Sequence, residues 1–234
     1  MITQLEYDIA LTDTLNSYAP RYFGDKPMTL DNVKQYIIES KVPGMRSVEF
    51  TTAEYNDYFV VAFQGTATND DWWADFNFIQ KQDKLVRGVA PDIKVHTGVE
   101  NQTNLALPTV QSILNNQRGK KIIITGHSLG GGIATLTAAN IKTQYPDLNI
   151  LPITFASLKV GNWAFADYYN KILPNHVRVW YNNDIVERMP PTDIWYRHVG
   201  TAIHITDRNM YNPWYQIFGN ANDHYPTNYL NYKV

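Results

Sequence analysis

The sequence predicts a single α/β domain over residues 1–234, with a mostly parallel central sheet and helices on both faces. Two observations support this prediction: strand-like and helical segments alternate from about residue 92 onward, and a glycine-rich turn joins one strand directly to a long helix. The expected strands are 93–96, 122–125, 150–155 and 177–181, and the expected helices are 99–116, 130–145 and 162–172. In such folds, active sites lie beyond the carboxyl ends of the strands.

The residues before this alternation predict two helices and a hairpin. Residues 5–18 and 31–40 are expected to be helices that cover one edge of the fold, the second with Asp31 as its N-cap. Residues 46–51 and 58–63 are apolar or alternate around Asn56-Asp57, which is typical of a β-hairpin.

The turn Gly126-His127-Ser128-Leu129-Gly130-Gly131 is the most informative feature of the chain. A tight strand-to-helix turn has no room for bulky side chains two positions before and after the serine, and glycine occupies both positions. Such a turn raises the Ser128 hydroxyl above the sheet and directs the first N–H groups of the helix, led by that of Leu129, at a reacting carbonyl oxygen. The alternative is a glycine-rich turn with an inert serine.

Composition and charge exclude several classes of protein. The 20 basic and 22 acidic residues give a net charge of −2 without a long run of like charge, so we expect no nucleic-acid partner. There is no cysteine, and no cluster of ligands predicts a metal or other cofactor. No segment has the length of a transmembrane span, and the first 20 residues do not resemble a signal peptide. Localisation therefore stays open.

A nucleophilic serine needs a base, and the base needs a carboxylate that orients it. Five aspartates follow Ser128 in the chain: Asp147, Asp167, Asp184, Asp193 and Asp207. Asp184 is favoured because it alone comes a few residues after a predicted central strand, at 177–181, although it is also placed to be an ordinary turn aspartate.

Three histidines follow Asp184. His198 and His204 lie in or beside a predicted edge strand at 196–205, whereas His224 lies in a loop before a predicted C-terminal helix. His224 is therefore the favoured base, and His198 is the main alternative. His127 is expected to point away from Ser128, and His96 is expected to be structural.

The apolar strand that ends at Phe63 leads into Gln64-Gly65-Thr66. Thr66 has a backbone N–H and a hydroxyl to offer a developing oxyanion, and the loss of one such donor typically costs about 3 kcal/mol of transition-state stabilisation. The alternative is an ordinary turn threonine.

Residues 67–79 follow Thr66 directly and predict a short amphipathic helix. Such a helix places Trp72, Phe76 and Ile79 on one face, with Asp71 and Asp75 beside them. Trp72, Trp73 and Phe76 are the candidate lid and substrate-binding residues. One interpretation is a lid that covers an acyl-binding groove and opens at a lipid surface. The other is a surface helix that is docked permanently on the core.

Several of these motifs, in this order, resemble those of the class 3 (fungal-type) lipases, a family of α/β-hydrolases. The resemblance spans roughly residues 58–230. The matching segments are 60–66 (ending R-G-T in the family), 71–75 (D-W-x-x-D), 95–99 (V-H-x-G-F), 126–131 (G-H-S-L-G-G), 155–165 (F-G-x-P-R-V-G-N-x-x-F), 179–191 (V-x-x-x-x-D-x-V-x-x-x-P-P) and 223–229 (D-H-x-x-Y).

Some positions depart from the family pattern. Gln64 replaces an arginine, Ala156 replaces a glycine, Leu158-Lys159 replaces Pro-Arg, and Tyr229 comes two positions late.

The resemblance implies a Ser-His-Asp triad of Ser128, His224 and Asp184, and an oxyanion hole formed by Thr66 and Leu129. It implies an acyl ester or lipid substrate, transient contact with a lipid surface and an extracellular location, for which a cytoplasmic location is the alternative. A triacylglycerol lipase is the favoured function, a short-chain carboxylesterase or phospholipase A1 is the alternative, and a non-catalytic lipase-like scaffold is a remote one.

Overall fold

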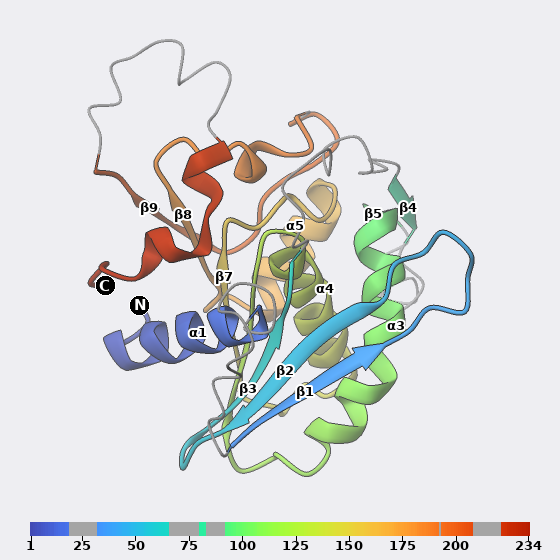
Figure 1. Cartoon of the computed structure of the whole chain (residues 1–234). Helices are drawn as coiled ribbons and strands as arrows, with labels where there is room; N and C mark the ends of the chain where they lie inside the picture. Colours follow the sequence, from blue (N-terminus) through green and yellow to red (C-terminus); the bar gives the residue numbers. More distant parts are fainter. Residues whose placement is uncertain (19–31, 66–79, 83–91, 192, 208–220) are drawn as a thin grey trace.

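The structure is a computed structural model that describes residues 1–18, 32–65, 80–82, 92–191, 193–207 and 221–234. Among these residues, seven strands form one sheet in the order β1-β2-β3-β6-β7-β8-β9 (Figure 1). Their bounds are β1 Val33–Ile38, β2 Val48–Glu54, β3 Tyr58–Phe63, β6 Lys121–His127, β7 Ile150–Phe155, β8 Val177–Tyr181 and β9 Thr201–Ile205. Within this sheet, β3, β6, β7, β8 and β9 pair in parallel, which confirms the predicted α/β fold class.

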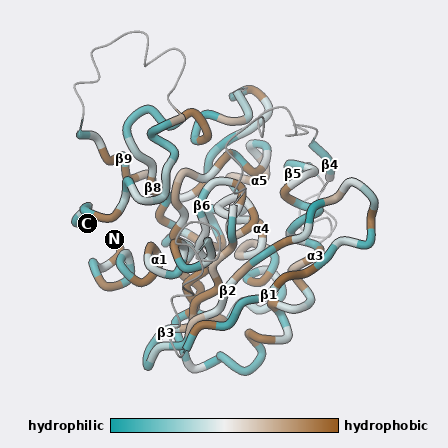
Figure 2. The backbone as a smooth tube through the Cα atoms, viewed as in Figure 1, coloured by the Kyte–Doolittle hydropathy of each residue, from teal (hydrophilic) through white to brown (hydrophobic). Residues whose placement is uncertain are grey.

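Helices cover both faces of this sheet. Their bounds are α1 Gln4–Ser17, α3 Thr97–Leu114, α4 Leu129–Gln144 and α5 Trp163–Ile172. Alternate residues of β3 pack on opposite sides: Val60 and Ala62 lie in one apolar cluster with α1, and Val61 and Phe63 lie in another with α3, α4 and α5. The hydrophobic residues accordingly gather in the middle of the molecule (Figure 2).

Two corrections concern the first half of the chain. Residues 33–38 form the edge strand β1, paired antiparallel with β2, and the predicted helix over 31–40 is wrong. The β-branched Val33, Ile37 and Ile38 fit a pleated edge better than a helix, and pairing with β2 satisfies their backbone groups. The predicted cap Asp31 lies outside the described residues.

The second correction concerns the strand predicted at 93–96. It exists as β5 Lys94–His96, but it pairs antiparallel with β4 Gln80–Gln82 in a separate two-stranded sheet. His96 is structural, as predicted, because its Nδ1 accepts the N–H groups of Gly98 and Val99 at the start of α3. Burial lowers the pKa of His96 to about 4, so the ring is neutral when it caps this helix.

The chain ends in short 3-10 turns instead of the predicted C-terminal helix. These are η2 Ala221–His224 and η3 Pro226–Tyr229, and a similar turn, η1 Val186–Arg188, follows β8. The hairpin of β2 and β3 is confirmed, and α3, α4 and α5 begin within two residues of the predicted positions. The parallel strands end together at what we call the carboxyl edge of the sheet, where Ser128 and Asp184 follow β6 and β8.

Candidate active site

Ser128 lies in a strained turn between β6 and α4. Its backbone has φ 62° and ψ −128°, a conformation that residues other than glycine rarely adopt. Its N–H donates to the carbonyl of Phe155 at 3.0 Å. A Cβ atom on Gly126 would lie 2.5 Å from backbone atoms of Gly130, and one on Gly130 would overlap the carbonyl oxygen of Phe63. Both glycines are therefore required by the turn, as the sequence predicts for a nucleophile elbow.

Leu129 is the first residue of α4, directly after Ser128. The first N–H groups of a helix have no acceptor within the helix and form a partly positive site. The backbone N–H of Leu129 thus belongs to the set of groups that are suited to an anion beside Ser128.

Asp184 and His224 are in direct contact. Nδ1 of His224 lies 3.0 and 2.9 Å from the two carboxylate oxygens of Asp184, which is fully buried. Oδ1 of Asp184 also accepts the N–H of Val186 at 2.9 Å, so the backbone of the turn after β8 fixes the orientation of the carboxylate. The structure thus brings together two side chains that are 40 residues apart in the sequence.

The turn η2 is held in place by contacts that the sequence does not reveal. The carboxylate of Asp223 accepts the N–H of Asn183 at 3.2 Å, so the neighbours of both members of the Asp184–His224 pair are themselves joined. Tyr229, the late tyrosine, is fully buried, with its ring 5.3 Å from that of Phe155. The turn η3 ends at Tyr229 and places its side chain in the core.

His127 connects this pair to the elbow. Its ring centroid lies 4.5 Å from that of His224, and burial, together with the nearby His224, lowers the pKa of His127 well below its usual value. The ring therefore stays neutral. Since His127 precedes Ser128 in the chain, this packing places His224 beside the elbow.

Tyr18, at the end of α1, is a site residue that the sequence does not predict. Its hydroxyl lies 3.2 Å from Nδ1 of His127 and accepts the N–H of Gly65 at 2.9 Å. A Cβ on Gly65 would lie 3.1 Å from the Cβ of Ser128, so the end of β3 lies against the elbow. No local pattern indicates this role, because Tyr18 and His127 are 109 residues apart.

The other candidates for the acid and the base have different partners. His198 lies 3.2 Å from the carboxylate of Glu187, and Nε2 of His204 lies 2.7 Å from the carbonyl oxygen of Asn182. Asp207 accepts from Tyr181 and Asn182, Asp193 pairs with Lys159, and Asp147 and Asp167 are exposed. Among the candidates in the described ranges, the structure thus pairs His224 with Asp184.

Four predicted site residues, Thr66, Trp72, Trp73 and Phe76, lie outside the described residues. Gln64, just before them, is buried and departs from the family's arginine. In the amide orientation that satisfies its neighbours, its nitrogen donates to the carbonyl of Ser17 at 3.0 Å and to the carboxylate of Glu49 at 2.9 Å. A neutral side chain therefore anchors the end of β3 in place of a cation.

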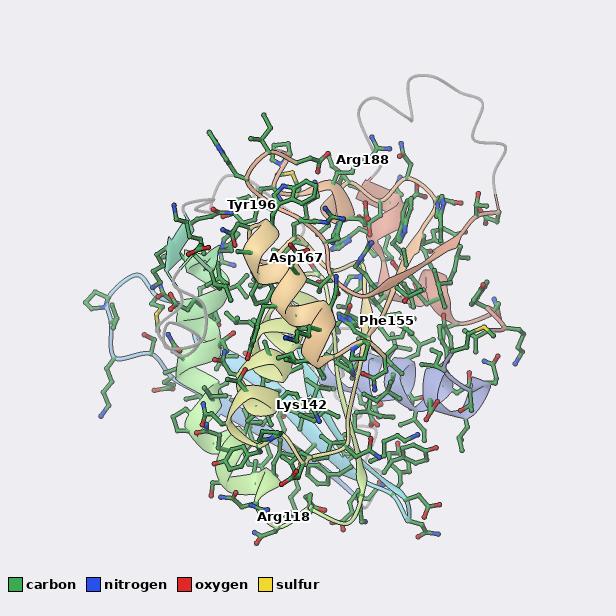
Figure 3. The ribbon with its side chains drawn as sticks, turned by 180° about the vertical axis from the view of Figure 1, so that it is seen from behind. Arg118, Lys142, Phe155, Asp167, Arg188 and Tyr196 are labelled. Carbon is green, nitrogen blue, oxygen red and sulfur yellow. The ribbon has the colours of Figure 1, made fainter. Side chains whose placement is uncertain are left out.

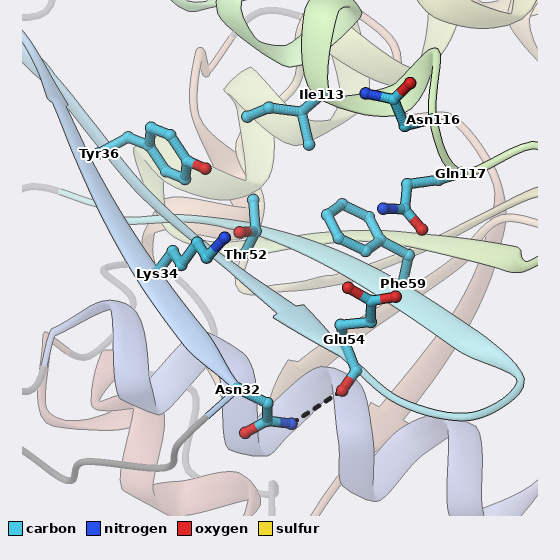
Figure 4. A pocket seen from close by; sticks show the side chains of 9 residues that line it. All are labelled: Asn32, Lys34, Tyr36, Thr52, Glu54, Phe59, Ile113, Asn116 and Gln117. Carbon is cyan, nitrogen blue, oxygen red and sulfur yellow. Dashed lines mark hydrogen bonds between the residues drawn. The ribbon is translucent and has the colours of Figure 1, made fainter.

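A cavity of about 230 Å³ lies away from these residues (Figure 4). It is bounded by β1, β2, the start of β3 and the end of α3, and Asn32 donates across its rim to the carbonyl of Glu54 at 3.0 Å. Phe59 in its wall pairs with Ile122 at the start of β6, whereas Ser128 follows the end of that strand. The cavity therefore belongs to the opposite edge of the sheet.

The described part of the chain has no group of three or more His, Cys, Asp or Glu side chains arranged to hold a metal ion. None of the helices in the described ranges has the length and hydropathy that a membrane crossing requires.

The chain resembles known proteins in both sequence and fold. The family model "Lipase (class 3)" matches residues 60–194, more than half of the 234 residues. The chain belongs to the class 3 lipases. This confirms the resemblance, and the match includes Ser128 and Asp184 but ends before His224.

Relatives and solved structures agree with this assignment. A secreted mono- and diacylglycerol lipase of Fusarium solani is 32% identical over 143 residues, which cover 59% of this chain and 41% of the relative. The triacylglyceride lipase of Rhizomucor miehei has the same fold, with a TM-score of 0.76, 21% identity, and coverage of 96% of this chain and 94% of that one. A second solved structure is a triacylglycerol lipase described as having a serine protease triad at its catalytic centre. It superposes with a TM-score of 0.75 and 23% identity, over 94% of this class 3 lipase and 92% of that chain. The chain spans half or less of the length of the curated relatives that it matches.

Two departures of this class 3 lipase from the family pattern have a structural explanation. Lys159 keeps a cation at the position after the missing proline, and its Nζ donates to the carbonyls of Arg188 and Pro190 and to the carboxylate of Asp193. Ala156 has φ 47°, in the left-handed region that favours the glycine of the family.

Proposed function

We propose that this chain is a carboxylic ester hydrolase that acts on acylglycerols, with Ser128 as nucleophile, His224 as base and Asp184 as the carboxylate that orients the base. The buried Asp184–His224 contact beside the strained Ser128 turn is the single observation that carries the proposal. The names of the relatives support the substrate class, since they are acylglycerol lipases.

The proposed reaction has two halves. In the first, the hydroxyl oxygen of Ser128 attacks the ester carbonyl while Nε2 of His224 takes its proton and returns it to the leaving alcohol, which gives an acyl-serine. In the second, water attacks the acyl-serine, again with His224 as base, and the carboxylic acid is released. Asp184 holds Nδ1 and stabilises the imidazolium that forms in each half.

The proposed oxyanion site combines the N–H of Leu129 with the N–H and hydroxyl of Thr66. Leu129 contributes the first N–H of α4. Gly65, the neighbour of Thr66, lies against Ser128, which supports the assignment of Thr66. Residues 67–79 are proposed to form the lid, with Trp72, Trp73 and Phe76 facing the acyl chain. The word "secreted" in the name of the Fusarium lipase supports the extracellular alternative for this chain.

The test is hydrolysis of p-nitrophenyl esters from acetate to palmitate, each below and above its aggregation concentration. Ser128→Ala is expected to lower turnover by roughly 10⁴-fold to 10⁶-fold without unfolding the chain, whereas Ser112→Ala, an exposed serine in α3, leaves turnover unchanged. A rate that rises with chain length and increases at aggregation supports a lid-gated lipase. Activity confined to short soluble esters makes the chain an esterase, and turnover that survives in Ser128→Ala contradicts the proposal.

A further inference from the structure

Three large apolar side chains are exposed together near the start of α5. They are Trp163, Ile194 and Trp195, with exposed fractions of 49%, 80% and 64%, and we call them the rim patch. They are neighbours because the indole nitrogen of Trp163 donates to the carbonyl of Asp193 at 3.2 Å, directly before Ile194.

The rim patch lies at the carboxyl edge, the same edge as Ser128. Helix α5 follows β7 and leads back to the start of β8, so its first residue, Trp163, is at the carboxyl ends of the strands. Figure 3 agrees: Tyr196, next to Trp195, lies beside the start of α5, and Arg118 lies at the opposite end of the molecule.

The residues on both sides of Ile194 and Trp195 are bonded to the rest of the fold. Lys159 pairs with Asp193 at 2.5 Å on one side, and on the other the N–H of Arg197 donates to the carbonyl of Gly161 at 2.8 Å. Tyr196 between them is buried, with an exposed fraction of 2%. Ile194 and Trp195 thus lie between residues that are bonded to the rest of the fold on both sides.

The rim patch is also bonded to β4. The side-chain amide of Gln80, the first residue of that strand, donates to the carbonyl of Trp195 at 2.5 Å.

We propose that the rim patch is a fixed anchor that inserts into a lipid–water interface and orients the carboxyl edge toward it, independently of any movement of the lid. This inference rests on the proposed function, because an acylglycerol hydrolase must reach substrate at such an interface. Indole rings favour the boundary between acyl chains and headgroups, where one side is apolar and the polar nitrogen stays hydrated or paired.

Charge and size favour a lipid surface over a second copy of the chain. The guanidinium of Arg197 lies 3.8 Å from the ring centroid of Trp163, so a cation that can pair with lipid phosphates accompanies the patch. The exposed area of the three side chains is on the order of 400 Å², about half of what each partner buries in a stable dimer. A patch of this size suits shallow insertion.

The test compares two double variants. Ile194→Ser with Trp195→Ser removes the most exposed part of the rim patch. Leu5→Ser with Leu230→Ser is the matched control, because these leucines have exposed fractions of 58% and 54%, and Leu5 lies near the amino end of β6, where Glu6 pairs with Lys121 at 2.7 Å. Binding to phosphatidylcholine vesicles is measured by co-sedimentation in the Ser128→Ala background, so that the vesicles are not hydrolysed.

We expect the rim-patch variant to bind the vesicles at least about tenfold more weakly, and the control to bind like the parent. With Ser128 present, the ratio of turnover on aggregated ester to turnover on soluble ester should fall in the same variant. No binding by the parent, equal binding by both variants, or a dimer in sedimentation velocity that only the rim-patch variant dissociates would overturn the proposal. Absence of all ester turnover, with vesicle binding that still depends on the rim patch, would instead contradict the proposed function.

Discussion

The two halves of the candidate site are held in different ways. The Ser128 turn belongs to one continuous segment, β6 through α4, and its shape depends on two glycines that touch backbone atoms. The Asp184–His224 pair joins two segments that are 40 residues apart, and both side chains depend on a network of long-range contacts. The first half is a local backbone structure, whereas the second is a tertiary assembly.

This difference means that the halves should fail in different ways. A change in the elbow should act through backbone geometry and stability. A change around Asp184 and His224 should alter turnover by moving the His224 ring, or alter stability by leaving a buried charge without its partner. Variants that separate these effects test the comparison.

The largest expected effect is that of His224→Ala. Loss of the proposed base should lower kcat by roughly 10⁴-fold to 10⁶-fold, and loss of the partner of the buried Asp184 carboxylate should cost about 1–2 kcal/mol of stability, as in the control below. The matched control is His198→Ala, which removes a hydrogen-bond partner of Glu187 and should cost about 1–2 kcal/mol of stability while folded molecules retain their turnover. If His198→Ala loses activity and His224→Ala does not, the base is wrongly assigned.

Glu187→Gln should destabilise the turn that carries Asp184. Burial alone would raise the pKa of Glu187, but the hydrogen bond with His198 and the charges of His198 and Arg178 lower it to about 2. The variant leaves Arg178, which pairs with Glu187 at 2.6 Å, buried without its anion, and this should cost about 3 kcal/mol at pH 7.

The pH dependence of that loss has a defined sign. Because the folded state lowers the pKa of Glu187, its contribution is complete above the unfolded value, which is about 4.3, and is lost as the pH falls toward 2. The difference in unfolding free energy between parent and Glu187→Gln should therefore shrink below about pH 4. A difference that grows as the pH falls would mean that Glu187 is not stabilised as an anion.

Gly130→Ala tests the elbow. The added Cβ would overlap the carbonyl of Phe63, so β3 and α4 must separate, at a cost of about 1–3 kcal/mol in chemical unfolding. Ala156→Gly is the control, because it changes a nearby residue with positive φ in the permitted direction and should shift stability by less than about 1 kcal/mol. Equal effects would show that the elbow is not tightly packed.

Tyr18→Phe should have the smallest effect. The variant loses the hydroxyl that accepts the N–H of Gly65 and contacts His127. We expect kcat to fall about tenfold with KM nearly unchanged. The reason is that Tyr18 positions Gly65, the neighbour of the proposed oxyanion residue Thr66, without touching the reacting atoms. Tyr55→Phe, which removes a hydroxyl bonded to Asp13, is the matched control, and equal losses of kcat would contradict a positioning role.

The same division explains how much could be predicted from the sequence. The elbow was predictable because its residues are contiguous and follow a known pattern of glycines around the serine, although the atoms that exclude a side chain at Gly130 belong to Phe63 and Gln64 at the end of β3. The place of Asp184 after a predicted central strand and of His224 in a loop, together with the family resemblance, selected these two residues without giving the contact that joins them. The roles of Tyr18 and Asn183 depend on partners 109 and 40 residues away, and no local pattern indicates such partners.

The incorrect helix prediction over residues 31–40 has a related cause. Val33, Tyr36, Ile37 and Ile38 fit the spacing of an apolar helix face, and only pairing with β2 decides that they form a strand. Tertiary pairing overrode a local pattern in that segment, and it also placed β5 in a separate sheet with β4. Segments whose pairing is set by the parallel core, such as β6 and β7, were predicted correctly.

The most direct measurement is covalent labelling by diethyl p-nitrophenyl phosphate, followed by mass spectrometry of the intact chain and of its peptides. Activated serines react with this phosphotriester, release p-nitrophenol and retain one diethylphosphoryl group. We predict one group per chain on the peptide that contains Ser128, no label in Ser128→Ala, and a rate at least about 10³-fold lower in His224→Ala. A label on another residue, or an unchanged rate in His224→Ala, would contradict the triad.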